Sequence, residues 1–437
     1  MKTSLKILIF GILSVAVSPA AMAQAPAPLQ SLIQQSFQNF TKLKEAEQLI
    51  RAGELRVDAA KTALLPYVSA AGSYNYITPT AKATLPLPEG AREIQFIPNH
   101  NISLGINGSY GLYDFGKTDL TIRQARENVL TSRHNLELNR HNLAYQIAQL
   151  YYNIAFLQKS LKVQQELIQV SEEVLKQVEQ RLKNGDALEF DVVSQQVKLK
   201  MTQNRKIDFE NQIEKQKAML SYLTGTPAAN ITIPELAVES SIPTASTASL
   251  LTLADGNSKE ILLAKDRIRS AETEIEIARK AHLPTVMLNG SVGEKNGYMP
   301  NVNQLRFNIA AGVSVNVPLY AGKRYDIQRR AAQVNLEATK YNLTAVNETL
   351  QKDIESVKID IKSNQLRLEN VGLQVTQAER ALTIAKNRLA NGTITNVELE
   401  SAQTGIEEAR LSQLNYQFQL FMNQLELKRL VGDEFWK

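Results

Sequence analysis

The sequence predicts an α+β membrane protein in which one unit, a β-hairpin joined to very long coiled-coil helices, occurs twice. An apolar seam with a coiled-coil spacing runs over 143–182, is interrupted only by Gln164 and Ser171, and returns 207 residues later over 350–389. Both seams stop at an Asn-Gly pair, a favourable left-handed helix end. Two segments of strict apolar–polar alternation, typical of half-buried strands, precede each seam. The repeated order indicates a duplication.

The N-terminus has the pattern of a signal peptide, predicted over residues 1–23. Lys2 and Lys6 precede the apolar run Ile7–Val17, and Ala21-Met22-Ala23 offers a small-residue cleavage site. The run is too short to span a hydrocarbon core of about 30 Å, which disfavours a membrane anchor. The chain contains no cysteine, and its net charge of +5 is spread along the helices, so disulfides and nucleic-acid binding are not expected.

The first structural repeat is predicted over 24–227. Helical spacing from Gln30 to Leu64 predicts one helix that stops at Leu65-Pro66, and Pro79–Pro98 is rich in proline and turn residues, so we expect an exposed loop there. The remaining elements follow in order: strands at about 66–77 and 101–113, a long helix at about 117–184 and a shorter helix from about Leu188 to Leu223.

The second structural repeat is predicted over 258–437, after a linker at 228–257 whose first part is rich in Pro, Ala, Ser and Thr. Leu283-Pro284 corresponds to Leu65-Pro66, and Leu319-Tyr320-Ala321-Gly322-Lys323 corresponds to the passage from strand to helix at 112–117. The expected elements are a helix at about 258–282, strands at about 284–293 and 305–319, a long helix at about 324–391 and a helix from about Val397 to Leu430.

This order of elements implies an assembly of several copies. A helix of about 67 residues extends ~100 Å, too far for one globular core to cover. Four strands leave unpaired edges. Strands with one apolar and one polar face suit a lipid-facing barrel with an aqueous lumen, and flanking tyrosines suit the membrane interface. The alternative for the strands alone is a soluble β-sandwich. The tyrosines are Tyr67, Tyr74, Tyr76, Tyr110, Tyr113 and Tyr320.

Over nearly the whole mature chain, this pattern resembles the TolC-like outer-membrane efflux proteins. The resemblance rests on the duplication, the Leu-Pro before each hairpin, the strand-to-helix passages, and the tips 180–185 and 388–392. It implies a homotrimer with a 12-stranded outer-membrane β-barrel continued by a periplasmic α-helical barrel. It further implies a passive exit duct for small molecules or proteins, in tripartite efflux or type I secretion. The implied partners are an inner-membrane transporter, a periplasmic adaptor and outer-membrane lipid.

The resemblance also assigns roles to the two turns at the ends of the long helices. Asp191 and Glu398 match acidic residues that line the pore constriction, where a ring of like charges would bind cations and respond to pH. Ser401 and Ile394 depart from the paired acids and the restraining residue of the family. The alternative for both acids is stabilisation of a helix start. The implied adaptor-contacting tips are Gly185, Asp186, Ala187, Leu188, Gly392, Thr393 and Ile394.

No pattern of catalysis or cofactor binding is present in the sequence. It has no phosphate-binding glycine loop, dinucleotide fingerprint or nucleophile elbow, so neither an enzyme nor a cofactor is expected. His134 and His141 lie ~10 Å apart along one helix, too far for a shared metal ion without other ligands. The alternative function is a periplasmic coiled-coil scaffold or adaptor without a pore, although such a protein would not duplicate the strand hairpins.

Overall fold

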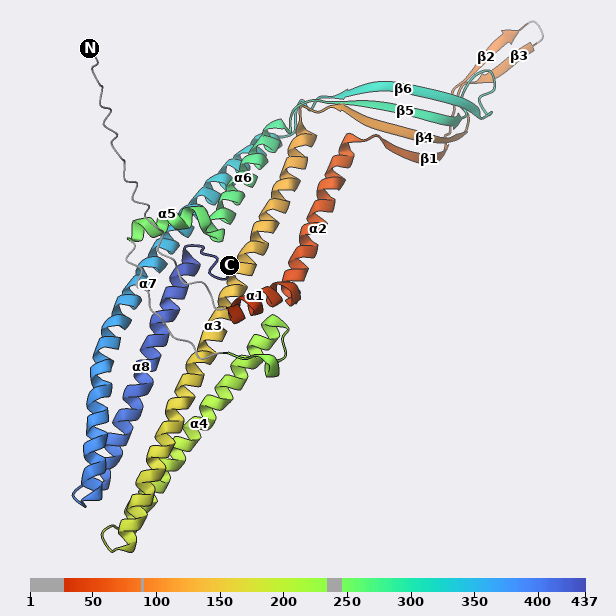
Figure 1. The fold of residues 1–437 in the computed structure, drawn as a ribbon. Helices are drawn as coiled ribbons and strands as arrows, with labels where there is room; N and C mark the ends of the chain where they lie inside the picture. Colours follow the sequence, from red (N-terminus) through yellow and green to blue (C-terminus); the bar gives the residue numbers. More distant parts are fainter. Residues whose placement is uncertain (1–26, 88–89, 234–245) are drawn as a thin grey trace, which may run out of the picture.

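The protein consists of a curved β-sheet at one end and a long helical part that extends away from it (Figure 1). The computed structural model describes residues 27–87, 90–233 and 246–437. The predicted signal peptide and residues 234–245 of the predicted linker lie outside these residues. The helices are α1 (Ala27–Asn39), α2 (Thr41–Lys61), α3 (Lys117–Lys183), α4 (Glu189–Thr224), α5 (Thr247–Asn257), α6 (Lys259–Lys280), α7 (Arg324–Ala390) and α8 (Asn396–Leu430), with 3-10 turns at Thr62–Leu64 and Ala228–Asn230. The strands are β1 (Tyr67–Tyr76), β2 (Lys82–Leu87), β3 (Gly90–Gln95), β4 (His100–Tyr113), β5 (Thr285–Lys295) and β6 (Arg306–Asn316).

Helices α3 and α7 form the frame of the helical part. Each has 67 residues, a length of ~100 Å, and each runs from the sheet to the far turns (Figure 1). Near the sheet, neighbouring helices follow the order α2–α3–α6–α7, and farther away the order is α4–α3–α8–α7. Helices α2 and α4 therefore share one lateral edge of the chain, and α7 forms the other edge along its full length.

The apolar seam becomes the core of this frame. Seam residues of α3, such as Ile147, Ile154 and Val178, are buried, as are Ile354 and Ile361 of α7. One cluster in the middle of the molecule joins α3 to α1 and to the C-terminal Phe435 and Trp436, and another lies beside the far turns. The coiled-coil period therefore predicted which side of each long helix packs against its neighbours.

The helix predicted from Gln30 to Leu64 is wrong as a single element. It breaks at Phe40, whose backbone is extended (ψ 116°), into α1 and α2. The break lets α1 cross the end of α4, where Ser36 Oγ donates to the carbonyl of Leu223 at 2.7 Å and Asn39 Nδ2 donates to that of Thr224 at 3.3 Å. These bonds satisfy carbonyls that a helix end leaves without a partner.

The loop predicted at Pro79–Pro98 is also wrong in part, because it contains the β2–β3 hairpin beyond the far end of the sheet (Figure 1). Lys82 and Glu93 form an ion pair at 3.4 Å across this ribbon. Pro86 is compatible with a two-stranded ribbon because its missing N–H can lie on the unpaired side. A second addition is α5, which lies within the predicted linker.

Candidate functional site

The four-stranded sheet collects most of its apolar side chains on one face and most of its polar side chains on the other, with Glu294 and Met287 as exceptions. Its order is β1–β4–β5–β6, all antiparallel, so neighbouring residues in the register point to the same side. One face carries Val68, Ala70, Tyr74, Ile102, Leu104, Ile106, Tyr110, Leu288, Val292, Phe307, Ile309, Val313 and Val315. The other carries Ser69, Ser73, Asn75, Asn101, Ser103, Asn107, Asn289, Ser291, Asn308 and Ser314.

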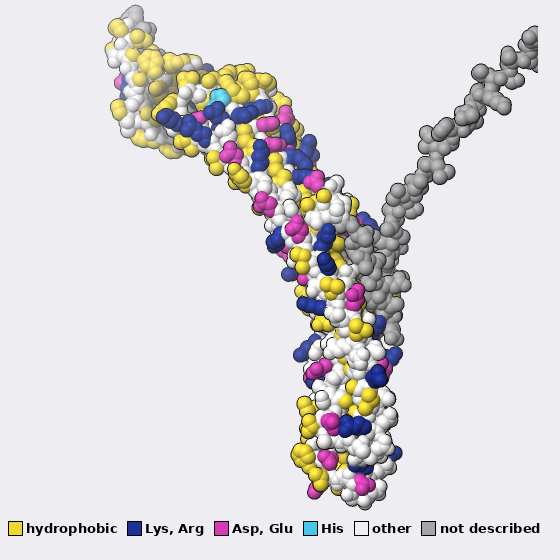
Figure 2. All heavy atoms as spheres, turned by 90° about the vertical axis from the view of Figure 1, so that its left-hand side faces the viewer, with side chains coloured by type: hydrophobic (Ala, Val, Ile, Leu, Met, Phe, Trp, Pro, Cys, Tyr) yellow, Lys and Arg dark blue, Asp and Glu magenta, His cyan; other side chains and the backbone are white. Residues whose placement is uncertain are grey.

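The apolar face is open to the surroundings in a single chain. Ile309 is 72% exposed, Phe307 67% and Val68 63%. Hydrophobic side chains gather over the sheet end of the molecule, whereas charges of both signs are spread over the helical part (Figure 2). An exposed apolar surface of this extent marks contact with lipid or protein.

Both lateral edges of the chain are also uncovered. Strands β1 and β6 end the described sheet, each with one side unpaired. The edge helices carry exposed apolar side chains along their length. On α4 these are Phe190, Val193, Val197, Met201 and Ile207, and on α7 they are Ile327, Val334, Tyr341, Ile359, Leu366, Leu373 and Ile384. Sheet edges and helix seams of this kind are typical contact surfaces for a neighbouring chain.

One face of α3 carries uncharged polar side chains. The side of α3 that includes Ile147 and Ile154 belongs to the same core cluster as α1. On roughly the opposite side, two heptad positions carry Asn128, Asn135, Asn142 and Gln149, and Ser132, Asn139, Gln146 and Asn153. None of these eight side chains is buried, so they form a hydrophilic stripe without fixed charge.

At the far end, two arginines in equivalent positions of the repeat close the turns. Arg181 donates to the carbonyl of Asp186 at 2.8 Å, and Arg388 donates to that of Thr393 at 2.6 Å. Arg181 also reaches the carbonyl of Leu389 at 3.2 Å and so links the α3–α4 and α7–α8 turns. This role was not predicted from the sequence, although both arginines lie in the repeated tip motif and the duplication could have indicated them.

The predicted constriction residues both stabilise the starts of their own helices. The Asp191 carboxylate accepts from the Leu188 N–H at 3.0 Å, and Glu398 accepts from the Thr395 N–H at 2.9 Å. The backbone and hydroxyl donors of Thr395, aided by Arg388, hold the pKa of Glu398 below its ordinary range. The structure forms no direct bond between the two carboxylates, but Gln195 and Asn396 bond at 2.8 Å and hold the two helix starts together.

The predicted tip residues divide into two groups. Gly185, Asp186, Leu188, Gly392 and Thr393 are exposed, and both glycines have the left-handed φ expected after a helix end, 84° and 70°. Ala187 and Ile394 instead pack against the apolar cluster beside the turns. Exposed Leu188, Phe190 and Val397 add apolar surface next to the tips.

Two negative findings apply to the described residues. No group of three or more His, Asp or Glu side chains in this part of the chain is placed to hold a metal ion. None of the described helices is long and apolar enough to cross a membrane.

Comparison with known proteins gives one family and one fold. The family model for outer membrane efflux proteins matches residues 32–226 and 250–433. A comparison with curated proteins gave no match.

Several solved structures share the fold. The outer membrane protein VceC of Vibrio cholerae is 20% identical, with a TM-score of 0.78 over 94% of this chain and 97% of that one. The CmeC outer membrane channel of Campylobacter jejuni is 15% identical, with a TM-score of 0.75 over 98% and 94%. The MtrE outer membrane channel of Neisseria gonorrhoeae is 16% identical, with a TM-score of 0.73 over 93% and 89%.

Proposed function

The chain belongs to the outer membrane efflux protein family, and we propose that three copies of it form a passive exit duct across the outer membrane and the periplasm. The duct would accept small molecules or proteins from an inner-membrane transporter through a periplasmic adaptor. The observation that carries the proposal is the sheet register, which collects apolar side chains on one face and polar side chains on the other. That division suits a wall with lipid outside and water inside.

A homotrimer satisfies the unpaired edges. If β6 of one copy pairs with β1 of the next, three sheets close into a 12-stranded barrel without an exposed edge. The same rotation places the α7 edge of one copy beside the α2–α4 edge of the next, where their exposed apolar seams cover each other. Helix α1 runs crosswise and would block the channel from the inside, so it lies outside the tube in this arrangement. The hydrophilic stripe, on roughly the opposite side of α3, therefore faces the lumen.

The tips are the proposed docking surface for the adaptor, and their exposed apolar side chains support this role. An adaptor without a pore is the weaker alternative, because it has no use for duplicated hairpins with a continuous exposed apolar face.

A cysteine cross-link between neighbouring copies tests the closure of the helical part. Glu166 of α3 and Glu379 of α7 both bind Arg410, and Gln164 of α3 binds the carbonyl of Thr202, so Ile207 and Leu373 lie at similar heights on opposite edges. Because the chain has no cysteine, the double variant Ile207→Cys with Leu373→Cys carries a single possible pair.

Oxidation of this double variant in outer membranes should give covalent dimers and trimers on a denaturing gel. Pairing Ile207→Cys with Val334→Cys, nearer the sheet, is the matched control and should give neither product. Equal yields from the two double variants would contradict the proposed edge contact.

The constriction gives a second prediction. Asp191→Asn and Glu398→Gln remove charge but keep groups that can accept the capping bonds, so they should lower cation selectivity and abolish block by divalent cations in planar bilayers. Because its folded pKa is depressed, Glu398 stays ionised, and its cap contributes stability, above the ordinary pKa of about 4.3. The charge of Glu398 in the constriction and the stability that its cap contributes should both be lost only as pH falls through the lower, folded-state pKa.

Thr395→Val is the matched control for that experiment, because it removes a capping hydroxyl and leaves the Glu398 charge in place. It should retain cation block. If the charge-removing variants keep wild-type selectivity and block, these acids act only as helix caps.

A further inference from the structure

A groove between α2 and α3 lies where the helical part meets the sheet. It has a volume of about 650 Å³ and is lined by Asp58, Lys61, Thr62, Leu64, Leu65, Asp119, Ile122 and Arg126. A second hollow of about 330 Å³ continues it along α2 and shares Asp58, Lys61 and Arg126. Together the two hollows form one open groove along α2 and α3.

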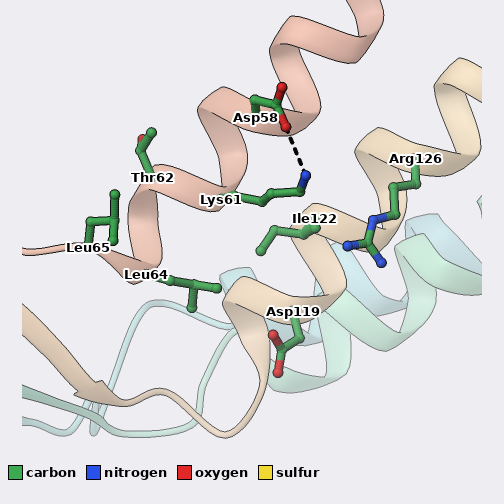
Figure 3. A pocket seen from close by; sticks show the side chains of 8 residues that line it. All are labelled: Asp58, Lys61, Thr62, Leu64, Leu65, Asp119, Ile122 and Arg126. Atoms are coloured by element: carbon green, nitrogen blue, oxygen red, sulfur yellow. Dashed lines mark hydrogen bonds and ion pairs between the residues drawn. The ribbon is translucent and has the colours of Figure 1, made fainter.

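The charges in the groove are only partly neutralised. Lys61 Nζ and Asp58 Oδ1 form an ion pair at 2.8 Å, and Arg133 at the far end of the second hollow is paired with Glu54 at 2.6 Å. Arg126 makes no ion pair or hydrogen bond with any other described residue. Asp119 makes no ion pair with any of the described residues. Figure 3 shows Arg126 across from the Lys61–Asp58 pair, with Asp119 on the same helix.

The groove also has an apolar side at its end nearest the sheet. Leu64 and Leu65 are 48% and 62% exposed, and they lie three and two residues before Tyr67, the first residue of β1. Asp119 lies in the first turn of α3, shortly after β4 ends at Tyr113. Both strand–helix junctions are thus within one or two helical turns of the groove.

The groove faces the outside of the proposed tube. Arg126, Arg133 and Arg140 recur every seven residues on α3, and the next members of this series, Ile147 and Ile154, belong to the core cluster that contains α1. Helix α1 lies outside the tube, because it would obstruct the lumen from within. An outward groove beside membrane-spanning strands is level with the lipid headgroups of the periplasmic leaflet.

From these observations we propose that the α2–α3 groove binds the headgroup of a zwitterionic glycerophospholipid, a phosphatidylethanolamine, from the periplasmic leaflet. This inference rests on the proposed outer-membrane function. The Arg126 guanidinium binds the phosphate, for which its fork of donors is suited. Asp119, seven residues earlier on the same face, binds the ammonium group. Leu64, Leu65 and Ile122 contact the glycerol and the first acyl carbons, which a free phosphate ion would leave uncovered.

The second repeat does not reproduce this groove. The residues equivalent to Asp119 and Arg126, 207 positions on, are Asp326 and Gln333. Asp326 is neutralised by Arg329 and Arg330, each at 2.8 Å, and the cation equivalent to Arg126 is missing. Each chain therefore holds one such site, and Arg330 provides a control arginine at the same height outside it.

Native mass spectrometry of the delipidated assembly in detergent tests the proposal. Wild type titrated with dioleoyl phosphatidylethanolamine should bind one lipid per chain, and Arg126→Gln should weaken this binding about tenfold, as expected for loss of a charge-assisted bond. Arg330→Gln should bind as wild type does. Asp119→Asn should remove the preference for phosphatidylethanolamine over phosphatidylglycerol.

Two further titrations distinguish binding of a lipid headgroup from binding of acyl chains alone or of free phosphate. Dioleoylglycerol, which has the same acyl chains without a phosphate, should bind at least tenfold more weakly, and millimolar inorganic phosphate should not displace the lipid. Equal lipid binding by Arg126→Gln and Arg330→Gln, or displacement by inorganic phosphate, would overturn the proposal. The same spectra give the number of chains, so failure of the lipid site is distinguishable from failure of the proposed trimer.

Discussion

Gly293→Ala should reduce the amount of folded protein in the outer membrane about tenfold or more. A Cβ atom at this position would overlap the carbonyl oxygen of Leu104 and lie 2.5 Å from the Cα of Gly105 on the neighbouring strand. Both are backbone atoms, so no side-chain rotation relieves the contact. Overpacking of this kind costs about 1–3 kcal/mol or more, and 1.4 kcal/mol is a factor of ten.

The reason lies in the pairing of β4 with β5. Gly105 and Gly293 are direct partners in the register, and the absence of both side chains allows the two backbones to approach closely. Gly312→Ala is the matched control, because a Cβ atom there meets nothing within 4 Å and the residue lies on the polar face of β6. Quantitative immunoblots of isolated outer membranes measure both variants. Equal abundance of the two would contradict this account of the sheet.

Glu407→Ala should destabilise the helical part by about 3–5 kcal/mol, the usual cost of removing one partner of a buried ion pair. The Glu407 carboxylate is 2% exposed and joins three helices. It pairs with Arg205 and with Lys198 of α4, the latter at 3.3 Å, and accepts from Gln164 of α3 at 3.4 Å. Without it, the largely buried Lys198 ammonium group loses its counter-charge, although Thr404 still accepts from it at 2.9 Å.

The matched control for Glu407→Ala is Glu379→Ala. Glu379 also pairs with an arginine, Arg410 at 2.9 Å, but its side chain is 49% exposed, and surface pairs contribute about 0–1 kcal/mol. Thermal unfolding of the detergent-purified assembly, followed by circular dichroism at the helical band, compares the two. The same midpoint for both variants would mean that the Glu407 network contributes nothing beyond an ordinary surface pair.

This network also explains why the sequence predicted the long helices well but not their polar interior. The seam of α3 was interrupted at Gln164 and Ser171. The structure bonds Gln164 to the Thr202 carbonyl and to Glu407, and Ser171 lines one small hollow between α3, α4 and α8 together with those two residues. A one-dimensional pattern shows that a seam changes character, but the partners come from helices about 40 and 240 residues away. The sequence therefore showed where the apolar seam is interrupted but not which side chains bind the polar residues there.

The errors in the predicted fold have similar causes. Apolar spacing continues through Phe40, so nothing local marked the break that lets α1 cover the end of α4. Pro86 led to the prediction of a loop instead of the β2–β3 ribbon, because proline is disfavoured in a strand unless one side of that strand is unpaired. At the tips, Asp191 and Glu398 both make the capping bonds that the simpler alternative expects, and their role in a constriction remains a proposal.

We propose that three copies of this chain form one channel in the outer membrane. The mass of the assembly extracted from that membrane tests this proposal most directly. The protein should be recovered from the outer-membrane fraction, and native mass spectrometry after mild detergent extraction should give a single species of three mature chains. The unpaired edges of the sheet and the exposed seams of α4 and α7 are the observations on which this expectation rests. Recovery in the soluble periplasmic fraction, or a monomer in detergent, would contradict it.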